Sequence, residues 1–106
     1  MSDVRYAVVT TACADEDEAE KIAGALLEKR LAACVQMFPV NSRYRWKGKL
    51  CADREVLLLV KCRRDRWADI ERTILEHHSY ELPEILLTPV EGGHSKYLEW
   101  IRENGE

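Results

Sequence analysis

The spacing of hydrophobic residues predicts alternating strands and helices along the chain. The run from Tyr6 to Ala12 combines aromatic, β-branched and small residues, which is typical of a strand with both faces covered. Asp15 and Glu18 then have the spacing of a capping box, so we interpret the acidic run around them as a helix start rather than a cation site. Apolar residues follow at the i, i+3, i+4, i+7 spacing of a helix face, at Ala19, Ile22, Ala23 and Leu26.

The middle of the chain is typical of a long β-hairpin. Residues 34–45 are strand-like, and Pro39 among them lacks the N–H of a central strand, which indicates an edge strand or a bulge. Gly48 can supply the positive φ of a tight turn. The returning arm ends in the continuous apolar run Val56–Val60, for which we predict a central strand.

Two aromatic residues lie near the tip of this predicted hairpin. Tyr44 and Trp46 alternate with charged residues, beyond the reach of a small domain's own core. Burying a Trp side chain removes about 200 Å² from water, roughly 5 kcal/mol at about 25 cal/mol per Å², so an exposed Trp would be unusual. We therefore predict that both residues lie in a subunit contact. The alternative is that Trp46 packs locally over the hairpin.

The last part of the chain predicts a helix, a strand and a final helix. Apolar residues at i, i+3 and i+7 form a helix face that Asp65 would cap, and residues 84–90 are strand-like. Ser95 is the expected N-cap of the last helix, which Gly105 ends. The order β-α-β-β-α-β plus a C-terminal helix predicts an α+β, ferredoxin-like sandwich, with both long helices on one face of an antiparallel sheet. We predict a single domain over residues 1–106.

Composition and charge argue against nucleic-acid binding and against a membrane-spanning protein. The chain has 16 Lys and Arg against 19 Asp and Glu, a formal charge of -3, so it lacks the positive field that favours nucleic acid. No run approaches the roughly 18 apolar residues of a membrane span, and the first residues do not resemble a signal peptide. We therefore expect a cytoplasmic protein with reduced cysteines, no membrane partner and no nucleic-acid partner.

The four cysteines have no C-x-x-C pair, which excludes a zinc site of the usual knuckle spacing. Cys34 and Cys62 lie in apolar runs and are expected to pack as small hydrophobic residues. Cys13 lies in the predicted loop TACADED, where we expect an exposed thiol.

The stretch HHSYELPE contains the strongest candidate metal ligands, His77, His78 and Glu84. Neighbouring residues on a helix point about 100° apart, so the two histidines cannot easily chelate one ion while the helix stays regular. Both could instead stabilise the negative end of the helix dipole, and His77 also continues the apolar face of Ile74. Pro83 directs an extended approach that could return Glu84 beside the histidines, where imidazole and carboxylate would suit Cu(II) or Zn(II).

Catalysis has weaker support in the sequence. His77 or His78 could act as general base for Cys13 or Ser79, but no spacing singles out such a pair. The motifs that cradle phosphate or perform acyl transfer are absent from the sequence. We therefore expect that the protein is not an enzyme and has no organic cofactor.

Several segments together resemble the CutA family, the divalent-cation tolerance proteins, across nearly the whole chain. They are VVTTA with DEDEAEKIAGALLEKRLAACV, then YRWKGKL, EVLLLVKC, HHSYELPEIL and YLEWI. The resemblance implies a ferredoxin-like protomer in a tight homotrimer similar in architecture to the PII signalling proteins, with hairpins that extend the sheet across subunits. Tyr44 and Trp46 would lie at that trimer interface.

The resemblance also implies copper(II) binding through a cysteine at the end of the first strand and the histidine pair. Carried over, the ligands are His77 and His78, with Glu84 nearby. Thr11 occupies the family's cysteine position, and Cys13, two residues later, is a candidate additional ligand. The alternative function, by likeness to the PII proteins, is a signalling or scaffold trimer whose clefts between subunits hold a small molecule or a partner protein.

Overall fold

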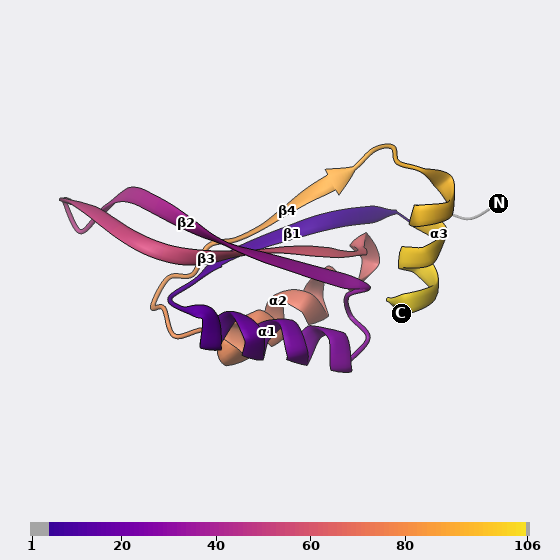
Figure 1. Cartoon of the computed structure of the whole chain (residues 1–106), viewed down its shortest axis with the longest axis horizontal. Helices are drawn as coiled ribbons and strands as arrows, with labels where there is room; N and C mark the ends of the chain where they lie inside the picture. The colour runs from indigo at the N-terminus through magenta and orange to yellow at the C-terminus, as the bar shows by residue number, and fades with distance from the viewer. Residues whose placement is uncertain (1–4, 106) are drawn as a thin grey trace.

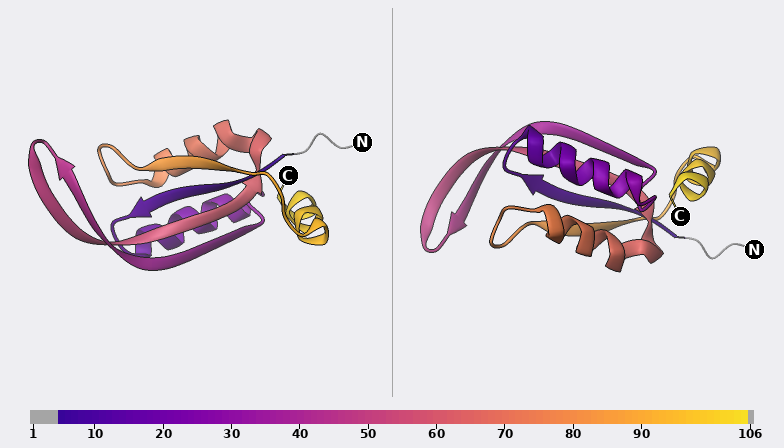
Figure 2. Two further views of the ribbon diagram at one scale, coloured as in Figure 1. Left: turned by 90° about the horizontal axis from the view of Figure 1, so that it is seen from above. Right: turned by 90° about the horizontal axis from the view of Figure 1, so that it is seen from below.

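The computed structural model describes residues 5–105, whose four strands form one antiparallel sheet in the order β2-β3-β1-β4 (Figure 1). Strand β1 (Tyr6–Cys13) lies between β3 (Lys49–Arg63) and β4 (Ile85–Val90), and β2 (Cys34–Trp46) is an edge strand. Helices α1 (Glu16–Glu28) and α2 (Trp67–His77) lie together on one face of the sheet. Helix α3 (Ser95–Asn104) lies beyond one end of the sheet (Figure 2). The predicted α+β ferredoxin-like architecture is confirmed.

The core lies between this sheet and its two helices. Alternate residues of β1 and β3 face the helices, because successive side chains of a strand point to opposite faces. Val9 and Leu58 are fully buried there, and Leu26 of α1 and Ile74 of α2 meet them from the helical layer. The apolar periodicity of each segment therefore creates one shared core.

The start of α1 positions the candidate site. Asp15 occupies the N-cap, and its carboxylate accepts a hydrogen bond from the backbone N–H of Glu18 at 2.9 Å. Glu18 in turn accepts from the N–H of Ala14 at 2.9 Å through Oε2. The predicted N-cap at Asp15 is confirmed, but the return bond of Glu18 goes to Ala14, the residue before the cap, and this bond holds the first turn of α1 directly after β1.

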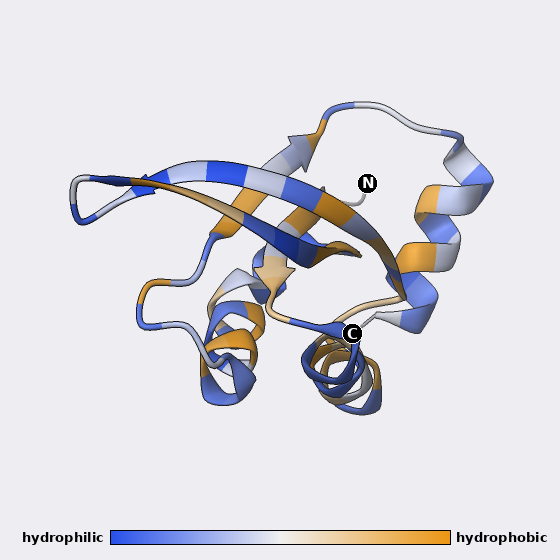
Figure 3. Ribbon diagram, turned by 60° about the vertical axis from the view of Figure 1, so that its left-hand side comes forward, coloured by the Kyte–Doolittle hydropathy of each residue, from blue (hydrophilic) through white to orange (hydrophobic). Residues whose placement is uncertain are grey.

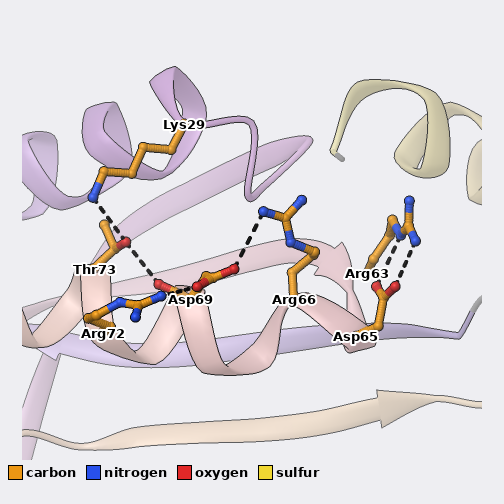
Figure 4. Close-up of polar contacts among 7 residues, drawn as sticks. All are labelled: Lys29, Arg63, Asp65, Arg66, Asp69, Arg72 and Thr73. Atoms are coloured by element: carbon orange, nitrogen blue, oxygen red, sulfur yellow. Dashed lines mark hydrogen bonds and ion pairs between the residues drawn. The ribbon is translucent and has the colours of Figure 1, made fainter.

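The predicted cap at Asp65 is wrong (Figure 4). The carboxylate of Asp65 accepts hydrogen bonds at 2.7 and 3.1 Å from the guanidinium of Arg63, within a short 3₁₀ turn (Arg64–Arg66), and α2 begins after it without a side-chain cap. The charge-assisted, two-bond contact with Arg63 outcompetes a single bond to a backbone N–H. It also holds the pKa of Asp65 below its ordinary value.

The predicted cap at Ser95 is also wrong. His94 occupies the N-cap position of α3, no side chain accepts a hydrogen bond there, and Ser95 is the first helical residue. Gly105 follows the helix as predicted, and its N–H donates to the carbonyl of Ile101 at 2.8 Å. Backbone pairing therefore closes the end of this helix.

The β2–β3 hairpin projects past every other element and gives the molecule its length of 50 Å against 25 and 22 Å (Figures 1 and 2). Its pairing continues from Cys34 opposite Lys61 to Trp46 opposite Lys49. Lys47 and Gly48 form the turn with φ of 50° and 78°, the two positive values that a type I′ hairpin turn requires. Pro39 lies within the edge strand, as predicted.

The two helices leave the other face of the sheet open (Figure 3). Val8 and Thr10 of β1 and Leu57 of β3 point to this face, opposite their buried neighbours, and are half-buried. Phe38 and Leu86 on the same face are 41% and 60% exposed. The expectation that β1 is covered on both faces is therefore wrong within one chain, because no third layer of helices is present among residues 5–105.

The core assignment predicts opposite results for two adjacent leucines of α1. Leu26→Ala removes a fully buried side chain and should lower the free energy of unfolding by about 2–5 kcal/mol. Leu27→Ala, at a side chain that is 45% exposed, should cost under about 1 kcal/mol. Urea denaturation followed by circular dichroism measures both. Equal losses in the two variants would contradict this assignment of the core.

Candidate functional site

Three side chains from separate segments converge where β1 leaves the sheet. Cys13 is the last residue of β1, Glu18 lies in the first turn of α1, and His78 directly follows α2. The Sγ of Cys13, a carboxylate oxygen of Glu18 and a ring nitrogen of His78 all lie within 4.8 Å of one another. We call them the Cys13–Glu18–His78 cluster. Of the residues from 5 to 105, these three form the one group of His, Cys, Asp and Glu side chains close enough to share an ion.

Glu18 ties together the chain segments of the cluster. Its Oε2 accepts from the N–H of Ala14, and its Oε1 accepts from the N–H of Ser79 at 2.6 Å. Partial burial opposes ionisation, but the hydrogen bonds from Ser79 and Ala14 and the nearby His78 outweigh it, so the pKa of Glu18 lies below its ordinary value. The cluster therefore contains a carboxylate that is charged at neutral pH.

The hydrogen bonds of His78 select one form of its ring. Nε2 lies 2.9 Å from the carbonyl oxygen of Ala12, and Nδ1 accepts from the N–H of Tyr80 at 3.3 Å. Because a carbonyl can only accept and an amide N–H can only donate, the proton belongs on Nε2 and the lone pair on Nδ1. The contact with Tyr80 is long, so the lone pair of Nδ1 is the ring's available ligand.

Cys13 is fully buried, so the expectation of an exposed thiol is wrong. Strand β1 extends one residue further than predicted and still pairs Cys13 with Val56, which turns the side chain into the core. Burial, with the nearby charges of Glu18, Asp15 and Glu55, raises the pKa of the Cys13 thiol to about 12. The thiol is thus protonated at neutral pH and is a poor nucleophile, which gives no support to a Cys–His catalytic pair.

The structure does not bring His77 or Glu84 into this cluster. His77 is exposed, and its Nδ1 lies 3.0 Å from the carbonyl oxygen of Thr73, so the side chain caps the end of α2. The expectation that His77 continues the buried face is wrong, because the helix ends there and the ring turns toward its own last carbonyls. Glu84 lies instead beside the hairpin, at the cavity described below.

Thr11, at the position where the resemblance implies a cysteine, is fully buried, and its hydroxyl has no hydrogen-bond partner. It faces the same side of β1 as Cys13, two residues further on. The thiol at this end of β1 therefore belongs to Cys13, which lies beside Glu18 and His78.

Glu18 is the one member of the cluster that was not predicted as a ligand. Its spacing from Asp15 correctly indicated a cap, and that interpretation set aside a cation site. The two roles are compatible, because each carboxylate oxygen has lone pairs beyond its one hydrogen bond. The available signal was topological, since the end of the first strand and the start of the first helix are adjacent in the chain.

A cavity of about 580 Å³ lies beside the hairpin. Tyr44 and Trp46 of β2 line it together with Glu55 of β3 and Tyr80 and Glu84 from the segment after α2. The Tyr80 hydroxyl donates to Glu55 at 2.7 Å, and burial with this contact raises the pKa of Tyr80. The Tyr44 hydroxyl donates to Asp53, which raises the pKa of Tyr44 to about 12. Both phenols are therefore neutral at physiological pH.

A solved structure is very similar to this one: that of the periplasmic divalent cation tolerance protein CutA from Archaeoglobus fulgidus. The TM-score is 0.93 at 39% identity, with 95% of this chain and 99% of that chain covered. The description of that protein as periplasmic overturns the expectation of a cytoplasmic location, because chains of the same fold occur outside the cytoplasm. Among residues 5–105, no helix is both long enough and apolar enough to cross a membrane.

Two sequence comparisons agree with the structural one. Curated divalent-cation tolerance proteins CutA from Archaeoglobus fulgidus and Thermus thermophilus are 43% and 42% identical, over 85% and 92% of this chain and 88% and 95% of theirs. A family model described as CutA1 divalent ion tolerance protein matches residues 7–104. The chain belongs to the CutA1 divalent ion tolerance protein family.

Proposed function

We propose that this protein serves divalent-cation tolerance by binding a divalent cation at the Cys13–Glu18–His78 cluster. The observation that carries the proposal is the convergence of a thiol, a carboxylate and an imidazole within 4.8 Å from three separate segments. The ion is the cargo of such a protein. The names of the relatives, as divalent-cation tolerance proteins, agree with this chemistry.

The donors of the cluster suit a borderline-soft ion such as Cu(II) or Zn(II). Glu18 is already ionised, and His78 has a lone pair on Nδ1 while Nε2–H donates to a backbone carbonyl, the outer contact that metal-binding histidines commonly make. Cys13 would have to lose its proton, and a bound dication would reverse the local charge that now prevents this. Three protein ligands leave a position for water or an exchanging ligand, as release of a cargo requires.

We further propose that the protein performs no catalysis of its own. The protonated, fully buried Cys13 lacks the thiolate that a nucleophile needs. The Nε2–H of His78 is held by the carbonyl of Ala12, so this proton positions the ring rather than serving proton transfer, and Nδ1 is the nitrogen left for an ion.

The assembly we propose is a homotrimer. The open face of the sheet exposes Phe38 and Leu86, and Leu50 near the hairpin tip is 78% exposed, an apolar surface that a second copy could cover. Tyr44 and Trp46 remain the proposed contact residues of the hairpin. The number of subunits follows from the resemblance to PII-like trimers, and C3 closure suits identical chains.

The cluster predicts which substitutions abolish cation uptake. Cys13→Ser and His78→Ala should each weaken Cu(II) and Zn(II) binding by at least about the tenfold to hundredfold that loss of even an outer contact costs. His77→Ala should change the affinity little, because that side chain caps α2 instead. Isothermal titration of the three variants and the parent measures this, with thermal melts as a folding control. Strong loss in His77→Ala together with unchanged binding by Cys13→Ser would point to the histidine pair rather than the cluster.

The raised pKa of Cys13 predicts that cation binding releases a proton. Because the free thiol is protonated well above neutral pH, the ion must displace a proton, and binding weakens as the pH falls. Between about pH 7 and pH 9 the Zn(II) affinity of the parent should rise about tenfold per pH unit, one proton for each ion. Competition with a chromophoric chelator measures the slope. The slope of Cys13→Ser should be lower by one proton, and equal slopes would exclude the thiol as a ligand.

The proposed assembly predicts that Trp46→Ala weakens association, because the neighbour would lose apolar contact area at the hairpin. Sedimentation velocity at low micromolar protein should show a shift from trimer toward smaller species. Leu75→Ala, which removes an exposed side chain on α2, is the matched control and should leave the trimer intact. A trimer equally stable in all three proteins would remove Trp46 from the interface.

A further inference from the structure

One backbone group of the chain occupies a ligand position of the proposed cation site. The N–H of Tyr80 donates to Nδ1 of His78 at 3.3 Å, at the lone pair that an ion would need. Nε2 does not offer a second lone pair, because its proton is held by the carbonyl of Ala12 at 2.9 Å. The Cys13–Glu18–His78 cluster is therefore closed at its histidine in this structure.

The space between the two nitrogen atoms is too small for an ion. A zinc ion lies about 2.0 Å from a histidine nitrogen, so on the 3.3 Å line from Nδ1 to the Tyr80 nitrogen it would have only about 1.3 Å left. No non-bonded contact is that short, and the amide hydrogen would point its positive end at the cation. Binding at Nδ1 thus requires the backbone at Tyr80 to move away.

The hydroxyl of Tyr80 holds this backbone in place. It donates to Oε2 of Glu55 at 2.7 Å, and Glu55 is only 9% exposed. A hydrogen bond to a largely buried carboxylate is strong, because its loss would leave a charge away from water without this partner. The Tyr80 ring also lies against the ring of His78, with centres 4.9 Å apart. The side chain is therefore anchored at its hydroxyl and packed along its ring.

The other attachment of this segment to the hairpin is weaker. Residues 79–84 belong to no helix or strand. The ion pair between Lys47 and Glu81 spans 3.8 Å and joins two highly exposed side chains, so it contributes little. Of these two contacts with the hairpin, the bond to Glu55 is the one that determines where Tyr80 lies.

The residue before Tyr80 is fixed on the cluster side. The N–H of Ser79 donates to the ionised carboxylate of Glu18 at 2.6 Å, a charge-assisted hydrogen bond. A movement that frees Nδ1 can therefore begin at Tyr80 and leave Glu18 where it is. The segment has a fixed point next to a residue with a single strong anchor, which is the arrangement of a small hinge.

We propose that Tyr80 gates the cation site: anchored on Glu55, it keeps Nδ1 of His78 occupied, and a divalent cation binds when Tyr80 moves away. The gate rests on the proposed function, since it regulates the same site. It lowers the apparent affinity by the fraction of molecules in which the site is open. It also favours release of the ion, because the N–H of Tyr80 returns to the lone pair as the ion leaves. Tyr80 is thus a positioning residue that does not itself bind the ion.

Removing the anchor should tighten cation binding. Tyr80→Phe deletes the hydroxyl without changing the charge, so more molecules are open and the Zn(II) affinity should rise about tenfold, the effect of one hydrogen bond to a charged group. Tyr97→Phe, at an exposed tyrosine of α3 at the opposite end of the molecule from the hairpin (Figure 1), is the matched control and should leave the affinity unchanged. Competition with a chromophoric chelator measures both. Adding Cys13→Ser to Tyr80→Phe should remove the gain, which places it at the cluster.

Nuclear magnetic resonance follows the gate itself. In excess EDTA, the amide of residue 80 should exchange with solvent faster in Tyr80→Phe than in the parent, because opening no longer breaks the bond to Glu55. Saturation of the parent with Zn(II) should shift the amide signal of Tyr80, since its N–H leaves Nδ1. A hydroxyl that only stabilised the fold would lower the melting temperature without raising the Zn(II) affinity. The Tyr80 signal of the parent tests the gate even if Tyr80→Phe folds poorly.

The outcomes separate the gate from the proposed function. Cys13-dependent Zn(II) binding that is equal or weaker in Tyr80→Phe would overturn the gate alone, as would an unshifted Tyr80 amide in the Zn(II)-saturated parent. Absence of Zn(II) binding in both proteins would overturn the proposed function and the gate together. Binding by Tyr80→Phe but not by the parent would support the gate, because the parent would then be almost entirely closed.

Discussion

The carboxylate of Glu18 is the contact on which the candidate site depends. One oxygen accepts the N–H of Ala14, which leaves β1, and the other accepts the N–H of Ser79, which follows α2. A single charged side chain thus joins the end of a strand, the start of one helix and the exit of the other. Because both bonds are made to the charged form, the carboxylate stays ionised and keeps these backbone groups in register. The hydrogen bond from Nε2–H of His78 to the carbonyl of Ala12 adds a second contact that holds His78 beside Cys13.

The charged Glu18 lies between the buried thiol of Cys13 on the core side and the segment of Tyr80 on the hairpin side. Toward the core, Cys13 is protonated, because burial and the acidic neighbours disfavour a thiolate, and only a positive charge would reverse that balance. Toward the hairpin, Tyr80 extends from His78, with ring centres 4.9 Å apart, and donates to Glu55. The cluster and the cavity are therefore neighbours, linked through Tyr80.

The hairpin serves both the cavity and the proposed assembly. Its strands pair well past the end of β1, so its outer half receives no support from the core and presents Tyr44, Trp46 and Leu50 at its surface. The half-buried residues on the open face of the sheet add to this apolar area. The proposed association would cover the open face of the sheet without any change of fold.

Motifs combined along the chain indicated the family, and the other features that the sequence by itself determined were local: the helix and strand periods, the helix cap at Asp15, the edge strand at Pro39 and the turn at Gly48. Each of these is encoded within a few consecutive residues, whose backbone preferences act before packing. Competition between partners decided the rest. Asp65 binds the guanidinium of Arg63 and does not cap α2. Strand β1 is one residue longer than predicted, which buries Cys13. Helix α2 ends at His77, whose ring turns to the carbonyl of Thr73, away from the cluster that His78 joins. The resemblance already implied Cys13 and His78 as ligands, but the place of Glu18 beside them could be known only from the tertiary structure, because the three residues lie in segments whose distance is set by how two helices pack on one sheet.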